Sequence, residues 1–210
     1  MNNAVWWPWA ALVLLGAYHG INPGMGWLFA VGRGFQEKSR DAVLRSLLPI
    51  ALGHEASIVM VVLAVSLSEQ FVPPFFIRLV AALVLVSFGV YKVARPHSHV
   101  RGFGMRIGPA GLAGWSFLMS SAHGAGLMLA PVLLGLPVYA AYHSLSELTL
   151  QAAAAATMHV AAMVMVMGIV SVVVYEKIGV RILRRGWFNL DLAWSALLIV
   201  SGTATLFTAI

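Results

Sequence analysis

The chain has 210 residues, of which 60% are hydrophobic and 10% are charged, and its mean hydropathy is +0.89. Ordinary soluble domains carry about 25% charged residues, and disordered chains carry little apolar surface, so this composition excludes both classes. The sequence holds no cysteine, which excludes disulfides, thiolate metal ligands and thiol nucleophiles. Length and composition together predict one small, all-α integral membrane domain.

Six apolar stretches, each about as long as the 20 residues of a membrane helix, follow one another along the chain. The first has no basic n-region and no cleavage site, so we expect it to persist as a helix with a tryptophan-rich start at the membrane interface. The first and fourth stretches are long and contain glycine and proline, which predicts that both helices are broken. The predicted spans are residues 5–32, 46–66, 76–94, 108–136, 149–174 and 188–209.

Basic residues alternate strictly with the predicted spans. All but one of the 13 Lys and Arg residues lie in the three linkers that follow spans one, three and five or, for Lys92, within three residues of one, and Arg78 is the exception. Because basic loops face the cytoplasm, this distribution predicts a multi-pass protein of a bacterial-type inner membrane, with both chain ends on the extracytoplasmic side. Topology and contact with anionic lipid therefore explain the net charge of +6, and we expect no nucleic-acid partner.

The two halves of the sequence match each other at a few polar and small residues. A His-Gly pair in span one recurs in span four, and a histidine in span two recurs in span five, at separations of 35 and 36 residues within the halves. We predict two three-helix repeats, residues 1–95 and 108–210, joined by a basic cytoplasmic linker at 96–107. Each repeat holds an odd number of spans, so the second is inverted, as in transporters with a site at the midplane. The matched pairs are His19 and His123, His54 and His159, Arg78 and Asp191, and Gly89 and Gly202.

Four histidines fall in the middle third of a hydrocarbon core about 30 Å thick, judged from a helical rise of about 1.5 Å per residue. A polar side chain at this depth usually faces a partner or a cavity, and neutral imidazole is a ligand for Zn, Cu, Fe and Ni. We therefore expect one transition-metal site, or two symmetry-related sites, between the repeats. Hydrogen bonds between packed helices are the alternative role. The expected ligands are His19, His54, His123 and His159.

The break in span one offers further donor atoms beside His19. Pro23 lacks a backbone N–H and the neighbouring glycines permit unwinding, which frees backbone carbonyls to coordinate a cation where they line a cavity. Asn22 adds a neutral oxygen and Met25 a soft sulfur, and we expect both to complete or support the metal site. A plain proline kink with a small-residue packing face is the alternative explanation.

Glu55 is the only acid near the centre of a predicted span, and it directly follows His54. Neighbouring helical residues point about 100° apart, so both side chains reach one ion only if the helix is distorted. We include Glu55 among the candidate site residues, either as a support for an imidazole or as a proton carrier. A structural pairing with Arg78 is the alternative.

Spans one and two resemble the nickel/cobalt transporters of the NicO and RcnA type, within the LysE superfamily of six-helix carriers. The first-span motif of that family is roughly H-x-x-x-P-G-H, and residues 19–25 here have the order His-Gly-Ile-Asn-Pro-Gly-Met. Its second span carries a histidine followed closely by a serine, as in Gly53-His54-Glu55-Ala56-Ser57. Met25 stands where the family has a second histidine, and Asn22 where an acid is common. The resemblance implies transport of a divalent transition metal, with a softer metal than nickel or cobalt left open.

The sequence thus favours a membrane transporter that passes a transition-metal cation through a histidine-lined midplane site by alternating access. The ion (Ni, Co, Zn or Cu) is the substrate, and we expect neither an organic cofactor nor enzymatic activity. One alternative is an intramembrane zinc hydrolase, with Glu55 as the base and Ser57 or Ser121 as an auxiliary. The others are carriage of an amino acid or another small solute, and a structural or assembly role. The bilayer is the expected partner, and a homo-oligomer stays open.

Overall fold

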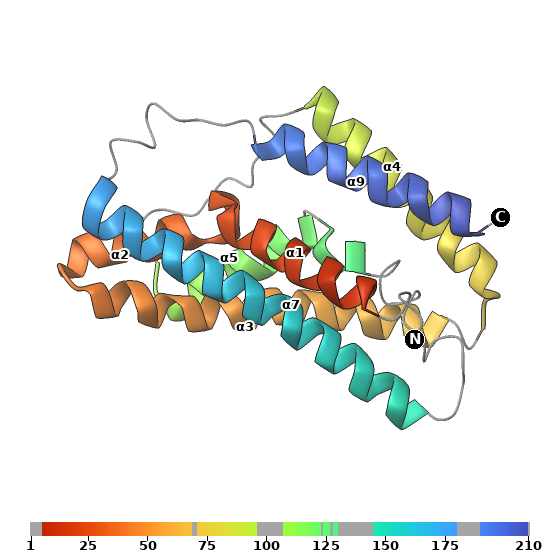
Figure 1. The fold of residues 1–210 in the computed structure, drawn as a ribbon, viewed down its shortest axis with the longest axis horizontal. Coiled ribbons are helices and arrows are strands. Elements are labelled where there is room, and N and C mark those ends of the chain that lie inside the picture. The colour runs from red at the N-terminus through yellow and green to blue at the C-terminus, as the bar shows by residue number, and fades with distance from the viewer. Residues whose placement is uncertain are drawn as a thin grey trace.

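A computed structural model describes residues 6–68, 71–95, 107–122, 124–126, 128–129, 145–179 and 190–209, most of which lie in helices (Figure 1). The expectation of an all-α chain is confirmed for these residues. The elements are α1 (Trp7–Ile21), the 3-10 turn η1 (Pro23–Met25), α2 (Trp27–Glu37), α3 (Arg40–Ser68), α4 (Pro74–Ala94), α5 (Pro109–Ala122), α7 (Leu145–Val173), the π-helix η2 (Val174–Ile178) and α9 (Leu190–Ala209). The predicted linker at 96–107 lies outside the described residues except for Ile107.

Three of the described helices are long and apolar enough to cross a membrane, namely α3, α4 and α7 with its π-helical end. α9 contributes a shorter apolar stretch, Ser195–Phe207. Large apolar side chains such as Leu48, Leu52, Leu83 and Val84 are exposed on the outer faces of α3 and α4. Apolar faces of this extent are expected to meet lipid and not water. The fold is therefore compatible with a membrane protein, while the number of spans and their orientation remain predictions.

The break expected in span one lies at residues 22–26. α1 ends at Ile21, the Asn22 Oδ1 accepts the Gly24 N–H at 2.9 Å, and η1 follows. Gly26 has a φ of 119°, in the left-handed region that favours glycine, and the chain then re-enters a helix at Trp27. Proline at the start of the turn and glycine at its end thus explain why one predicted span becomes two helices.

A second break lies in the predicted span four. α5 ends at Ala122, and the Gly124 N–H donates to the Ser121 carbonyl at 3.0 Å in a tight turn. Gly124 has a φ of 68°, and its own carbonyl accepts the Met128 N–H at 2.9 Å, so a helical course resumes beyond it. Both predicted interruptions are therefore present, each with a glycine in the left-handed region.

α1 and α7 pack closely and run in the same direction. A Cβ added to Gly16 would overlap the His159 carbonyl oxygen, and one added to Gly20 would lie 2.5 Å from the Met163 carbonyl oxygen. Residue numbers thus rise together along the two helices. Small residues four positions apart permit such a backbone approach between membrane helices.

α3 and α5 also run in the same direction. A Cβ added to Gly53 would overlap the Ala113 carbonyl oxygen, and the Ser57 Oγ and Ser121 Oγ, which lie further along both helices, are 2.9 Å apart. These two contact points enclose His54 on α3. They also hold the end of α5 against the centre of α3.

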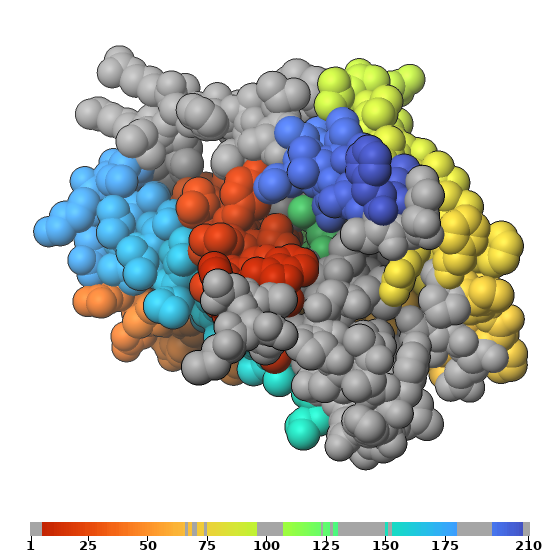
Figure 2. Space-filling view, turned by 45° about the vertical axis from the view of Figure 1, so that its right-hand side comes forward, coloured from red at the N-terminus to blue at the C-terminus, as the bar shows by residue number. Residues whose placement is uncertain are grey.

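α4 and α9 form an antiparallel pair that contacts mainly itself and lies beside the other helices (Figure 1). A Cβ on Gly89 would lie 3.0 Å from the Ser195 carbonyl oxygen, and one on Gly202 would lie 2.9 Å from the Ala82 carbonyl oxygen. Figure 2 shows the two helices adjacent at the surface of the molecule. Leu85 and Leu198 join this pair to Met128 through a small buried cluster.

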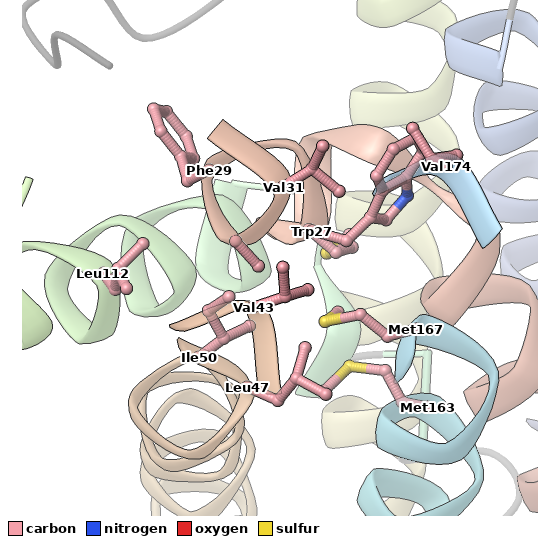
Figure 3. Close-up of a cluster of buried hydrophobic side chains, with 12 residues drawn as sticks. Trp27, Phe29, Val31, Val43, Leu47, Ile50, Leu112, Met163, Met167 and Val174 are labelled. Carbon is pink, nitrogen blue, oxygen red and sulfur yellow. The ribbon is translucent and has the colours of Figure 1, made fainter. Parts of the chain in front are cut away.

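The largest apolar core lies where α2, α3, α5 and α7 meet (Figure 3). Ile50 of α3 and Met163 and Met167 of α7 are fully buried in it, together with Met25 of η1. Trp27 begins α2 within the same cluster and is 5% exposed. Close packing of these side chains holds the broken segment against α3 and α7.

Candidate metal centre

Three imidazoles meet in the interior of the molecule. His19 lies in the last turn of α1, His54 near the middle of α3 and His159 in α7, and their relative exposures are 1%, 0% and 0%. One ligand nitrogen from each residue lies within 4.8 Å of the other two. The ring centroid of His19 lies 5.2 Å from that of His54 and 4.9 Å from that of His159. The rings of His54 and His159 are stacked, with their centroids 5.6 Å apart. The expectation that these three histidines lie together is therefore met.

Backbone carbonyls of α1 orient two of the three rings. The His19 Nδ1–H donates to the Leu15 carbonyl at 2.7 Å, and the His159 Nδ1–H donates to the Leu12 carbonyl at 3.2 Å. A carbonyl oxygen only accepts, so the proton of each neutral ring is on Nδ1 and the lone pair is on Nε2. The His159 Nε2 is buried and has no hydrogen-bond partner among the described residues. Hydrogen bonds of this kind usually orient imidazoles that bind metals.

The ligand spacing is close to what a transition metal requires. Zinc binds imidazole nitrogen at about 2.0–2.1 Å, and two tetrahedral ligands are then about 3.3 Å apart. The three nitrogens lie within 4.8 Å of one another, so the rings would have to move closer to reach this spacing when an ion binds. The cluster contains no carboxylate, so it supplies three neutral donors. Three ligands leave one coordination position of a tetrahedral ion open.

Gly16 and Gly20 position the site, although the sequence argument did not single out Gly16. A side chain at Gly16 would overlap the backbone of His159, so glycine allows α7 close enough for His159 to reach the Leu12 carbonyl. The signal was present as the pattern Gly16-Ala-Tyr-His-Gly20, a G-x-x-x-G spacing typical of close membrane-helix contacts.

The backbone of the first break is satisfied by two tryptophans that the sequence argument did not connect with it. The Trp27 Nε1–H donates to the Ile21 carbonyl at 3.0 Å, and the Trp115 Nε1–H donates to the Gly24 carbonyl at 3.2 Å. Two backbone carbonyls of the break are therefore occupied by indole donors. The break positions His19 at the end of α1, while these two carbonyls hold the turn together.

Two other predicted ligands of the break have structural contacts of their own. The Asn22 Oδ1 accepts the Gly24 N–H, and its buried Nδ2 has no hydrogen-bond partner among the described residues. Met25 is fully buried in the apolar core beside Ile50 and Met163. Neither assignment to the metal site is tested by these contacts.

Glu55 lies next to the cluster in sequence but is not one of its members. It is half-buried, and its Oε2 is buried without a hydrogen-bond partner among the described residues. His123, the fourth expected ligand, lies outside the described residues. Ser57 and Ser121, the expected auxiliaries of a hydrolase, pair with each other through their hydroxyls.

Two ion pairs join charged residues near helix ends. Arg33 and Glu37 pair at 2.8 Å on α2, and Arg40 at the start of α3 pairs with Glu176 of η2 at 3.3 Å. The second pair joins the linker after the first predicted span to the end of the fifth. Two of the three basic regions are thus at the same end of the molecule.

Comparisons with known proteins give no independent assignment. No family model, no curated protein and no solved structure matches this chain. The functional argument therefore depends on the three-histidine cluster and the packing around it.

Proposed function

We propose that this chain is a membrane transporter of a transition-metal cation, of the nickel or cobalt kind or else zinc or copper. The observation that carries the proposal is the meeting of His19, His54 and His159, which are buried on three different helices with ligand nitrogens within 4.8 Å of one another. Burying three polar rings in an apolar interior is unfavourable unless they have partners. A metal ion held between the three rings would bind one nitrogen of each.

The chemistry of the donors suits an ion that must leave again. A structural zinc site is normally closed by four ligands, often thiolates, and holds its metal tightly. This cluster offers neutral imidazoles without a carboxylate, so the bound ion keeps its full charge in an apolar surrounding. Protons compete with metal for the same nitrogens, which provides a route to release.

The packing pattern supports two inverted repeats. The predicted repeat exchanges α1 with α5, α3 with α7 and α4 with α9, and the observed partners α1–α7, α3–α5 and α4–α9 are unchanged by that exchange. In the α4–α9 contact, the residue pairs are also exchanged when repeat counterparts are taken 113 residues apart. Gly89 meets Ile199, and their repeat counterparts Gly202 and Val86 meet in the same way.

Helix directions and charges support six alternating spans. Alternation requires α1 to be parallel to α7, α3 to α5, and α4 to be antiparallel to α9, and the glycine contacts have these directions. The Arg40–Glu176 pair brings two basic linkers to one end, as expected for cytoplasmic loops.

The repeat relation also suggests how the site works. It exchanges His54 with His159, so the pair lies across the repeat axis, and it relates His19 to His123. We therefore retain His123 as the expected fourth ligand, with Asn22, Met25 and Glu55 as supporting residues. A rocking motion of one repeat against the other then exposes the ion to each side in turn.

An intramembrane zinc hydrolase is the second candidate. Three histidines with an open fourth position are the ligand arrangement of many catalytic zinc sites, and the buried Glu55 Oε2 is available as a base. If the protein is a hydrolase, Glu55→Gln abolishes turnover of a lipid or peptide substrate while the zinc stays bound. The parent then shows no metal flux across the membrane.

The decisive experiment measures metal flux into liposomes that contain the purified protein and an enclosed metal indicator. Ni²⁺, Co²⁺, Zn²⁺ and Cu⁺ are supplied in turn to the parent, to His159→Ala and to Ser171→Ala, a buried control on the same helix whose hydroxyl bonds to the Met167 carbonyl. We expect flux of at least one metal in the parent and the control, with a loss of at least tenfold in His159→Ala. Absence of flux for every metal, or equal flux in the histidine variant, contradicts the proposal.

A further inference from the structure

Two buried serines of α5 differ from other buried serines of this chain. Ser116 and Ser120 are both 0% exposed, and neither Oγ has a hydrogen-bond partner among the described residues. Ser46 and Ser171 are equally buried, but their hydroxyls donate to the carbonyl four residues earlier, at 2.7 and 2.6 Å. The unpaired hydroxyls on α5 therefore call for a partner other than their own helix.

The packing of α5 against α3 brings these serines to the level of the metal cluster. Ala113 meets Gly53, the residue before His54, and Ser121 meets Ser57, one turn after it. Ser116 and Ser120 lie between these two contact points on α5, as His54 does on α3. The serines and the histidine therefore occupy the same short stretch of the α3–α5 contact.

The helical register shows which way the serines face. Ala113 faces α3, whereas Met119 lies against the first break, with its Cε 3.6 Å from the position of a Cβ on Gly24. At about 100° per residue, Ser116 falls roughly midway between these two directions and Ser120 about 20° from Ala113. Both hydroxyls thus point between α3 and the break that ends α1, where His54 and His19 are located.

Unpaired hydroxyls in an apolar interior are unfavourable unless water or an ion reaches them. We propose that Ser116 and Ser120 line a route along α5 that is closed to water in this structure, where both side chains are 0% exposed, and that opens to admit a partly hydrated divalent cation to the three-histidine cluster. The identity of the ion rests on the proposed function, whereas the route itself does not. The two serines are one turn apart and thus about 6 Å apart along the helix. Each hydroxyl oxygen can therefore replace a water ligand of the cation as the ion moves from one serine to the next.

Neutral hydroxyls suit this role. They replace water around a cation without adding charge, and they hold it more weakly than imidazole does. The ion is therefore passed along the route and held only at the histidines.

Cysteine accessibility tests the route without requiring transport. The chain has no cysteine, so Ser116→Cys and Ser120→Cys each introduce a single thiol. Ser46→Cys and Ser171→Cys are matched controls, because they are equally buried but bonded to their own helices. Native membranes are treated with a small, charged methanethiosulfonate, and the rate of labelling is measured with and without Zn²⁺.

We expect the two α5 thiols to react at least tenfold faster than both controls, and Zn²⁺ to slow their reaction. In a His159→Ala background this protection should disappear, because the bound ion is no longer held beside the route. Labelling at the control rate overturns the proposal, and fast labelling that Zn²⁺ leaves unchanged overturns the connection to the cluster.

A variant with both serines replaced by alanine separates this proposal from the proposed function. In the liposome assay we expect the double alanine variant to lose at least fivefold in metal flux, while the purified protein binds Zn²⁺ as the parent does. Unchanged flux contradicts the route even where the protein transports metal. If the parent carries no metal flux, but the two α5 thiols react fast and Zn²⁺ slows their reaction, then transport is contradicted and the proposed route is supported.

Discussion

Substitution of Gly16 by alanine should separate α7 from α1 and disorder the metal cluster. The added methyl would overlap the carbonyl oxygen of His159 and lie 3.1 Å from the Ala162 Cβ. An ordinary carbon–oxygen contact is about 3.3 Å or more, so α7 must withdraw by about 1 Å. The obstacle is backbone, which a change of side-chain rotamer cannot relieve.

This displacement breaks the hydrogen bond that orients His159. The His159 Nδ1 and the Leu12 carbonyl oxygen are 3.2 Å apart, and a withdrawal of about 1 Å takes the pair beyond hydrogen-bond range. Loss of a bond that orients a metal-binding imidazole typically lowers affinity by about 10–100-fold, which corresponds to about 1.4–2.8 kcal/mol. The forced separation of the helices should also destabilise the fold by about 1–3 kcal/mol.

The assay is competition for Zn²⁺ between the purified protein and a chelating indicator, with thermal unfolding followed in parallel. Gly114→Ala is the control, because a Cβ there has no neighbour within 4 Å. We expect Gly16→Ala to bind Zn²⁺ at least tenfold more weakly and Gly114→Ala to bind it as the parent does. Equal affinity of the two alanine variants would refute the claim that close approach of α1 and α7 positions the site.

Three further predictions follow from the contacts of the break and the cluster. Asn22→Ala removes the acceptor for the Gly24 N–H and should lower the free energy of unfolding, measured by denaturant titration, by about 0.5–2 kcal/mol. If the same variant also lost metal affinity tenfold, Asn22 would be added to the ligands. Trp115→Phe leaves the Gly24 carbonyl without its indole donor and should destabilise the protein by about 1–3 kcal/mol in denaturant titrations, with Trp6→Phe, an exposed position, unchanged. Metal affinity in the chelator assay should fall as the pH is made acid, because protons displace the ion from imidazole, and an affinity that acid pH leaves unchanged would contradict imidazole ligation.

The elements that depend on local chemistry were predictable from the sequence. Pro23 with its glycines specified the first break, and the depth of His19, His54 and His159 along their spans indicated that these rings share a level. Proline and glycine act through their own backbones, and depth follows from helical rise alone. Such properties need no knowledge of which helices are neighbours.

The partners across helices were not predictable in the same way. The indole of Trp115 is 91 residues away from the Gly24 carbonyl that it satisfies, and His159 is 147 residues away from the Leu12 carbonyl. An almost uniformly apolar sequence carries little face-specific pattern, because lipid and core are equally apolar. Small residues such as Gly16 hold the pairing information instead, through the close contacts that they permit.

Metal-edge X-ray absorption on the purified protein loaded with one equivalent of Ni²⁺ or Zn²⁺ tests the central claim most directly. We predict at least three nitrogen or oxygen scatterers at about 2.0–2.1 Å, with the outer-shell scattering of several imidazoles, and the loss of one imidazole contribution in His159→Ala. A spectrum without imidazole scattering, or one that His159→Ala leaves unchanged, contradicts the assignment of the three-histidine cluster as a metal site.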